Sequence, residues 1–352
     1  MERKAKTGAL IAGLVLAAAT VAILSAGAQS LPARQSFEIV TGPVAGTYFP
    51  MGELIARVVS HPAGLVRCER NGVCGPPGVI VSARTSDGAV ANVLAVNAGQ
   101  AASGLAQGNV VADAVAGRGV FRRYGRQNHI RVMADLFSES MQLVVPAGSP
   151  IHSVKDLRGK RVSIGNLQSG SYVIASAILA AYDVRRAKLV HESYEASGGL
   201  MREGKLDAFF FLGGAPSPLI ADLVERLHAR LVPIDGPERA KLVAKVQGLS
   251  ADIIPNGAYR GMGRLETISC HTLWVVKDNA PADAVYAMVR ALYDPANRPM
   301  LAQAPKPADE IRLGEQISLL SVPWHPGALR FYREAGQLPA PPPRPKTAPK
   351  KK

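Results

Sequence analysis

Residues 37–52 read FEIVTGPVAGTYFPMG, and this stretch decides the fold class. Phe37–Thr41 is a short apolar run that predicts a strand. The small and turn-forming residues of Gly42–Phe49 predict a loop. Pro50 suits the first turn of a helix, whose apolar stripe would be Leu54, Ile55, Val58 and Val59. The stretch is therefore a strand–loop–helix unit.

Similar units follow along the chain. We expect further strands at Val79–Ala83, Met141–Val145, Val162–Gly165, Ala208–Leu212 and His271–Val276. We expect helices at Ser86–Ala95, after Ser171, at Gly198–Glu203, from Pro218 with Ser217 as its cap, and at Pro281–Leu292. This alternation of strands and helices predicts an α/β fold.

Composition excludes several classes of protein. The chain has 352 residues, 47% hydrophobic and 19% charged, which is too apolar for a wholly disordered protein. Its net charge is +14, of which about half lies in the first 28 and last 15 residues. The remaining basic residues are scattered without a basic–aromatic stripe, so nucleic-acid binding is not expected.

The N-terminus predicts export. A basic start, Met1–Lys6, precedes the uncharged, mostly apolar run Gly8–Leu24 and then Ala26-Gly27-Ala28. This pattern is typical of a cleaved signal peptide covering residues 1–28. The alternative is an uncleaved membrane anchor at residues 8–24, which is near the lower length limit for a span. Both place the body outside the cytoplasm, and residues 338–352 predict a disordered basic Pro/Lys tail.

The cysteines fit an oxidising compartment. Cys68 and Cys74 flank an Asn71-Gly72 turn signal, so a disulfide is expected. Closing this loop should contribute ~2.4 kcal/mol in the chain-entropy view. The alternative is a metal site, for which His61 would be the nearest further ligand. Cys270 lies in an apolar run and is expected to be a buried free thiol.

Three loops have few or small side chains: Gly42–Tyr48, Asn166–Ser171 and Gly213–Pro216. Such loops let backbone N–H groups face a ligand, and a following helix N-terminus favours negative charge. In open α/β sheets, ligands bind at the carboxyl ends of strands. The loops therefore predict an anion-binding cleft between two lobes.

Enzyme and cofactor motifs are missing from the sequence. Gly42–Gly46 is not the dinucleotide fingerprint, and no Gly-Lys-Ser/Thr follows it. The seven histidines show no zinc-protease pairing, and the chain has no Gly-x-Ser-x-Gly elbow. His325 is expected to fix the chain near its end. We therefore predict no enzyme activity, no cofactor and no metal site.

The chain resembles the TAXI family, the periplasmic substrate-binding subunits of one branch of TRAP transporters. The resemblance runs from about Phe37 to Glu334 and combines segments that are weak singly but specific in this order. The segments are Ile39–Gly52, Thr85–Asn92, Leu105–Gln107, Val154–Gly165, Gly204–Phe211 with Pro216–Pro218, and His325–Gly327.

The resemblance implies a type II periplasmic-binding-protein fold with two α/β lobes and a ligand cleft between them. Lobe 1 would be residues 36–137 plus 268–337, and lobe 2 would be residues 138–267. The protein would capture a small organic anion, a glutamate-like amino acid or a carboxylic acid, by hinge closure and deliver it to a TRAP membrane permease. Two alternatives stay open: a periplasmic ligand-binding partner of a sensor, and an exported enzyme on a binding-protein scaffold.

The loops and the resemblance together give a set of expected ligand-binding residues. Tyr48 would supply an aromatic wall with a phenolic donor, and Ser169–Ser171 would supply donors at a helix start. Gly213–Pro216 would form the floor of the second lobe. The full set is Gly46, Thr47, Tyr48, Asn92, Gln107, Ser169, Gly170, Ser171, Gly213, Ala215 and Pro216.

Overall fold

The computed structural model describes residues 35–62, 65, 68, 73–304, 306–314 and 322–339. The predicted signal peptide or anchor and most of the predicted tail lie outside these residues. No helix in the described ranges is long and apolar enough to cross a membrane.

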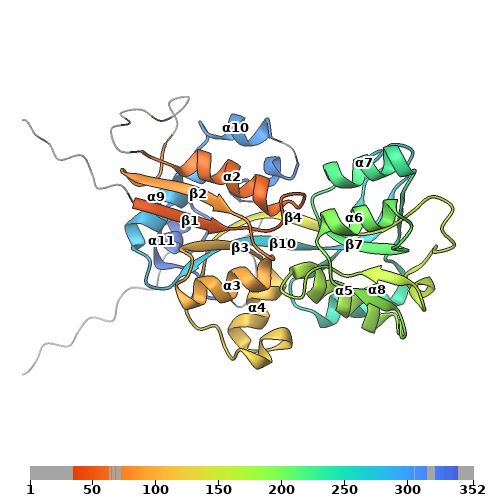
Figure 1. The fold of residues 1–352 in the computed structure, drawn as a ribbon. Helices are drawn as coiled ribbons and strands as arrows, with labels where there is room; N and C mark the ends of the chain where they lie inside the picture. Colours follow the sequence, from red (N-terminus) through yellow and green to blue (C-terminus); the bar gives the residue numbers. More distant parts are fainter. Residues whose placement is uncertain are drawn as a thin grey trace, which may run out of the picture.

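The first lobe combines the N-terminal part of the chain with its C-terminal end (Figure 1). Its parallel strands stand in the order β2-β1-β3, with bounds β1 Gln35–Val40, β2 Val79–Arg84 and β3 Ser103–Gln107. Its helices are α2 Tyr48–Val59, α3 Ala89–Ala98, α4 Gly108–Ala116, α9 Ala282–Leu292, α10 Arg298–Ala302 and α11 Pro326–Glu334.

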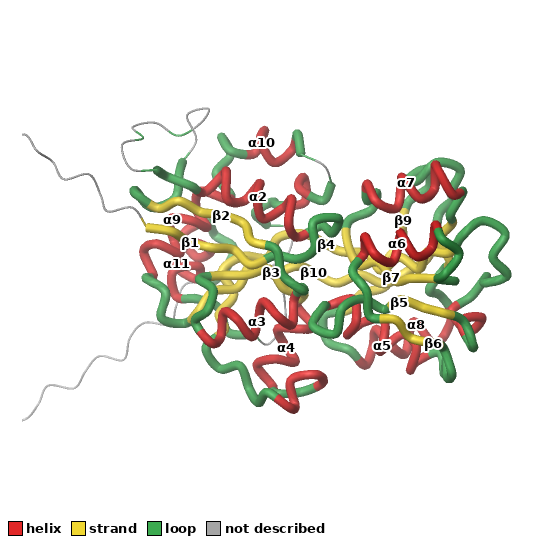
Figure 2. Tube along the Cα trace, in the orientation of Figure 1, coloured by secondary structure: helices red, strands yellow, loops and turns green. Residues whose placement is uncertain are grey.

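The second lobe repeats the plan with the middle of the chain (Figure 2). Its parallel strands are β5 Arg161–Ser163, β6 Lys188–Val190 and β7 Ala208–Gly213, in the order β7-β5-β6. Two more strands, β8 Arg230–Val232 and β9 Leu249–Ile254, pair with the long strands described next. Its helices are α5 Gly170–Ala181, α6 Tyr194–Arg202, α7 Pro218–Leu227 and α8 Gly236–Lys245.

Two long antiparallel strands, β4 Ile130–Val145 and β10 Leu265–Lys277, run through both lobes and join them (Figure 1). The hydrophobic core divides along them. The core of the first lobe includes β4 residues up to Phe137 and β10 residues from Leu273 onward. The core clusters of the second lobe use residues between Met141 and Cys270. The predicted α/β class with two lobes of the type II periplasmic-binding-protein kind is confirmed. The predicted limits of the lobes, as units that move, stay a prediction.

Two helices begin elsewhere than predicted. Helix α3 starts at Ala89, not Ser86, because the Ser86 hydroxyl is used in the loop, where it contacts Thr41 and Asn92. Helix α6 starts at Tyr194, not Gly198, because Ser193 caps it by accepting from the Ala196 amide. Ser217 does take the cap position of α7, but its hydroxyl makes no cap hydrogen bond.

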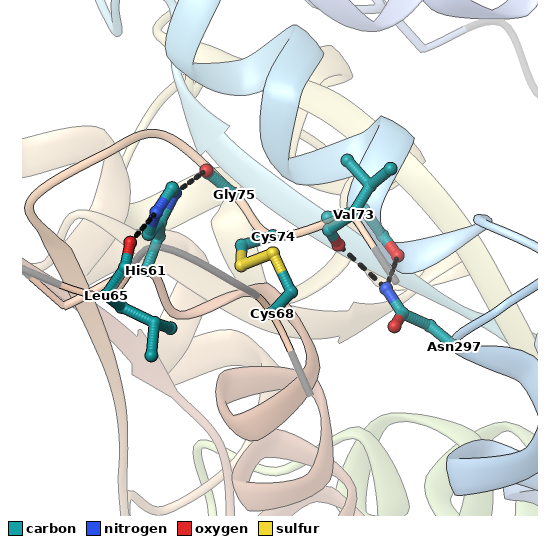
Figure 3. The surroundings of a disulfide bond; sticks show 8 residues. His61, Leu65, Cys68, Val73, Cys74, Gly75 and Asn297 are labelled. Carbon is teal, nitrogen blue, oxygen red and sulfur yellow. Dashed lines mark hydrogen bonds between the residues drawn. A yellow bond between two sulfur atoms is a disulfide. The ribbon is translucent and has the colours of Figure 1, made fainter. Parts of the chain in front are cut away.

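The predicted disulfide and free thiol are both confirmed: Cys68 is bonded to Cys74, and Cys270 is free and buried (Figure 3). Around the disulfide, the two ring nitrogens of His61 lie 3.0 Å from the Gly75 carbonyl oxygen and 3.1 Å from that of Leu65. His61 therefore braces the loop and does not face the sulfurs as a metal ligand. The side chain of His325 accepts from the Gly327 amide at the start of α11, which confirms that it fixes the chain near its end.

Candidate functional site

A cavity lies between the two lobes, at the carboxyl ends of strands from both. Loops after β1 and β2 and the end of β3 face loops after β5 and β6 and the end of β7. About 440 Å³ there is free of protein atoms, part of it open to solvent. The crossing strand β4 contributes one residue, Glu139.

The lobes touch each other around this cavity. The Gly214 amide of lobe 2 donates to Thr47 Oγ1 of lobe 1 over 3.0 Å, and the Ala45 amide donates to Glu195 Oε1 over 2.7 Å. On the other side, the Val90 amide donates to the Gln168 carbonyl oxygen over 3.0 Å. The two lobes are therefore in direct contact on both sides of the cavity.

Four helices begin at the wall of the cavity. Tyr48 starts α2, Ala89 starts α3, Gly170 starts α5 and Tyr194 starts α6, and all four residues line it. The first amides of a helix have no partner within the helix, and its N-terminus carries partial positive charge. The first turns of α2, α3 and α5 hold no acidic residue that would use this charge. In α3 the Val90 and Ala91 amides already donate to the Gln168 carbonyl oxygen. The helices that can offer first-turn amides to an anion are therefore α2 and α5.

The charged side chains of the cavity are acidic. Asp87, Glu139 and Glu192 line it, and the described lining includes no lysine or arginine. Negative charge on a ligand would thus be met by helix N-termini and neutral donors, not by a cationic side chain.

Glu139 lies at the floor and is 1% exposed. Its Oε2 accepts from Gln107 Nε2 over 2.7 Å and from Thr272 Oγ1 over 2.8 Å. Burial raises the pKa of Glu139 to about 7, and the hydrogen bonds from these two side chains oppose part of the rise. Near neutral pH this carboxyl can therefore either keep or lose its proton.

Two polar atoms beside Glu139 are buried without a hydrogen-bond partner: the Tyr48 hydroxyl and Gln107 Oε1. The Tyr48 hydroxyl lies near Glu139. Burial raises the pKa of this hydroxyl, and the nearby Glu139 carboxylate raises it further. No hydrogen bond of good geometry joins the two groups. Tyr48 and Gln107 are 5% and 4% exposed, and both residues line the cavity. Unpartnered buried polar atoms are uncommon, and at a cavity a ligand or an ordered water can supply the missing partner.

The wall contributed by lobe 2 is already hydrogen-bonded internally. The hydroxyls of Ser171 and Tyr194 are 2.7 Å apart, and Tyr194 also donates to the Leu212 carbonyl oxygen over 3.1 Å. Ser169 Oγ donates to the Asn166 carbonyl oxygen and accepts from the Tyr172 amide, so it caps α5. The amides of Gly170 and Ser171, and not the serine hydroxyls, are therefore the free donors of this wall.

Seven of the eleven residues predicted for ligand binding line the cavity: Gly46, Thr47, Tyr48, Gln107, Ser169, Gly170 and Ser171.

The other four do not line it. Asn92 is buried and donates to the carbonyl oxygens of Thr41 and Leu105, so it holds two strand ends in place. A Cβ on Gly213 would lie 2.5 Å from Thr47 Oγ1, so this glycine permits the contact between the lobes. Ala215 and Pro216 follow Gly214, outside the lining residues.

Sequence reasoning missed one residue of the floor and one of the wall. Glu139 and Tyr194 were not predicted, although Glu139 is one of two acids in the mostly apolar stretch Ile130–Val145. An acid within such a stretch was the available signal. Tyr194 was missed because α6 was expected to begin four residues later. Among the described residues, no group of three histidine, cysteine, aspartate or glutamate side chains is arranged to hold a metal ion.

Comparison with solved structures finds proteins of low sequence identity. MatC from Rhodopseudomonas palustris with bound malate is 15% identical, and the match covers 79% of this chain and 92% of that one with a TM-score of 0.49. A Xanthomonas citri protein bound to a chloride ion is 11% identical, with coverage of 85% and 95% and a TM-score of 0.43. The alkanesulfonate-binding protein SsuA from Xanthomonas axonopodis pv. citri bound to MOPS is 15% identical, with coverage of 70% and 66% and a TM-score of 0.38.

The sequence itself gives the stronger assignment. Residues 39–336 match a single protein family over both lobes and both crossing strands. The chain belongs to the NMT1-like family.

Proposed function

We propose that this protein is the extracytoplasmic solute-binding subunit of a TRAP-type secondary transporter of the TAXI branch. It captures a small organic molecule that carries a carboxylate and delivers it to the membrane permease. It acts by binding alone, without catalysis, cofactor or nucleic acid. Its export would depend on residues 1–28 as a signal, or on residues 8–24 as an anchor.

One observation carries this proposal: four helix N-termini from two lobes surround one cavity that has no lysine or arginine in its described lining. A carboxylate there would accept hydrogen bonds from first-turn amides, such as those of Gly170 and Ser171. Hydrogen bonds to a charged group are worth ~1.5–3 kcal/mol each. Two or three of them would supply roughly 3–9 kcal/mol, which corresponds to dissociation constants from millimolar to about micromolar.

Closure would work through the contacts that already join the lobes. The bonds Gly214–Thr47 and Ala45–Glu195 can form only when the lobes approach. A ligand that contacts both lobes favours this closed state over an open one. The permease would then recognise the closed form.

The close approach of Gly170 and Gln107 offers a sharp test. A Cβ on Gly170 would lie 2.0 Å from Gln107 Oε1, so Gly170→Ala should hold the lobes apart and disturb the floor. We expect it to weaken binding roughly ten- to a hundredfold, because overpacking of this kind costs about 1–3 kcal/mol. Gly199→Ala is the matched control, since a Cβ there would meet nothing within 4 Å.

Calorimetry of the exported protein with a panel of mono- and dicarboxylates, including L-glutamate and malate, measures the effect. We expect at least one member to bind the native chain and the Gly199 variant equally and the Gly170 variant more weakly. Absence of binding by every carboxylate would overturn the proposal. Unchanged binding by Gly170→Ala would place the site elsewhere.

A further inference from the structure

The floor of the cavity, defined as Tyr48, Gln107 and Glu139, differs in chemistry from the wall. The wall offers helix amides, which donate. The floor offers Gln107 Oε1 and the Glu139 carboxylate, which accept when Glu139 is ionised, and the Tyr48 hydroxyl, which can do either. A bound molecule would therefore need hydrogen-bond acceptors at the end that faces the wall and donors at the end that faces the floor.

In the part of the chain that the structure describes, no cationic side chain lies at the floor. The side chains that face Glu139 are Tyr48 from α2, Gln107 from β3, Cys270 and Thr272 from β10, and Tyr194 from α6. All of these are neutral, and the other charged groups in the lining, Asp87 and Glu192, are acids. A buried carboxylate without a cation is unfavourable, so a bound molecule that brings one would gain a strong interaction.

We propose that the floor is an ammonium subsite: Glu139 and Gln107 Oε1 accept N–H bonds from a cationic group of the ligand while its carboxylate lies at the helix N-termini. The inference rests on the proposed function and narrows it. The preferred ligand is a small zwitterion, and a molecule of the same shape that places a second carboxylate or a methylene at the floor is rejected. Glu139 is thus a residue that determines specificity.

Proton linkage follows from this geometry. A ligand ammonium favours the ionised form of Glu139, so a zwitterion should expel any proton held there. Its affinity should therefore fall as pH decreases below about 7, by up to tenfold per pH unit. A ligand whose second carboxylate occupies the floor would show the opposite trend, because it would need that proton to remain.

Matched pairs of probes separate the two levels of the proposal. The native, exported chain is titrated calorimetrically with L-glutamate and glutarate, with L-norvaline and valerate, and with 1-aminobutane. We expect the amino acid of at least one pair to bind at least thirtyfold tighter than its partner acid. Glu139→Gln should reduce that preference to within about threefold.

Control variants keep the outcome clear. Glu225→Gln makes the same change of charge on α7, where Glu225 is exposed and pairs with Arg260, and it should leave binding unchanged. The melting temperature of Glu139→Gln is measured alongside, and Glu139→Asp, which keeps the charge, should retain part of the preference. A stable Glu139→Gln variant with the native preference overturns the ammonium subsite.

The remaining outcomes distinguish the two claims. If the acids without an ammonium bind as tightly as the amino acids, carboxylate capture stands and the ammonium subsite fails. If 1-aminobutane binds and the acids do not, the subsite stands and carboxylate capture fails. If no probe binds, both are overturned.

Discussion

Two buried acids on the same crossing strand have opposite surroundings. Oδ1 of Asp135 lies 3.0 Å from Nδ1 of His271, and Glu310 is near this histidine. Glu139 instead accepts hydrogen bonds from the neutral side chains of Gln107 and Thr272. Both acids are less than a tenth exposed.

A bulge in β4 between the two acids explains how one strand places them in different surroundings. The pairing of β4 with β10 slips between Phe137 and Asp135, so Leu136 has no partner across the ladder. Because side chains alternate along a strand, one extra residue puts Asp135 and Glu139 on opposite faces. Asp135 contacts His271 where the two crossing strands pair, outside the ligand cavity.

The two acids differ in whether the protein supplies a basic partner for the carboxylate. The hydrogen bond that His271 shares with the Asp135 carboxylate raises the pKa of the histidine, so the protein itself supplies a partner for this acid. Glu139 has no such partner in the described lining, and its own pKa is raised. The first acid is paired within the protein, and the second is the one for which we propose a partner on the ligand.

The largest expected effect concerns Glu139 and stability without ligand. The folded chain keeps a proton on Glu139 up to about pH 7, whereas the unfolded chain loses it near 4.5. The free energy of unfolding should therefore fall as pH rises between these values, by on the order of 3 kcal/mol. The Glu139→Gln variant has no carboxyl to ionise at this position, so its free energy of unfolding should not fall in this way. It should be more stable than the native chain at pH 8 and of similar stability at pH 4. Urea unfolding at both pH values measures it, and a variant that is less stable at pH 8 would contradict the account.

Asp135→Asn should have a smaller effect of the opposite sign. The pKa of His271 is raised above 6.5 in the folded chain, so the pair contributes fully below 6.5 and its contribution is lost as pH rises through the folded pKa. We expect a loss of about 1 kcal/mol at pH 5.5, since the histidine is partly exposed, and less at pH 8.5. Thermal unfolding at the two pH values checks this. An equal loss at both would mean that the ion pair contributes nothing beyond a neutral hydrogen bond.

The smallest effects separate Tyr48 from Ser171. Tyr48→Phe removes a hydroxyl that has no partner, so it should weaken ligand binding by roughly tenfold and not lower the melting temperature. Ser171→Ala removes a hydroxyl that is already bonded to Tyr194, so it should cost ~1 kcal/mol of stability and change binding less than threefold. Calorimetry and thermal unfolding of both variants test the contrast. The reverse pattern would show that Ser171 and not Tyr48 contacts the ligand.

The loops of the site were predictable from sequence because small residues and strand–helix alternation are local signals. Gly46–Tyr48 and Ser169–Ser171 were found in this way, and both line the cavity. Glu139 was not found, because its role depends on a bulge and on partners such as Thr272, which is 133 residues away. Asn92 was misplaced for the same reason, since its contacts with Thr41 and Leu105 bury it behind the wall.

The central claim is that the Glu139 carboxylate binds a cationic group of the ligand. Proton release on ligand binding tests this claim most directly. Calorimetry at pH 7 in two buffers of different ionisation enthalpy counts the protons exchanged when the tightest amino-acid ligand binds. With the pKa of Glu139 at about 7, the account predicts release of about half a proton per ligand by the native chain and none by Glu139→Gln. Proton uptake, or equal release by the native chain and the variant, would contradict it.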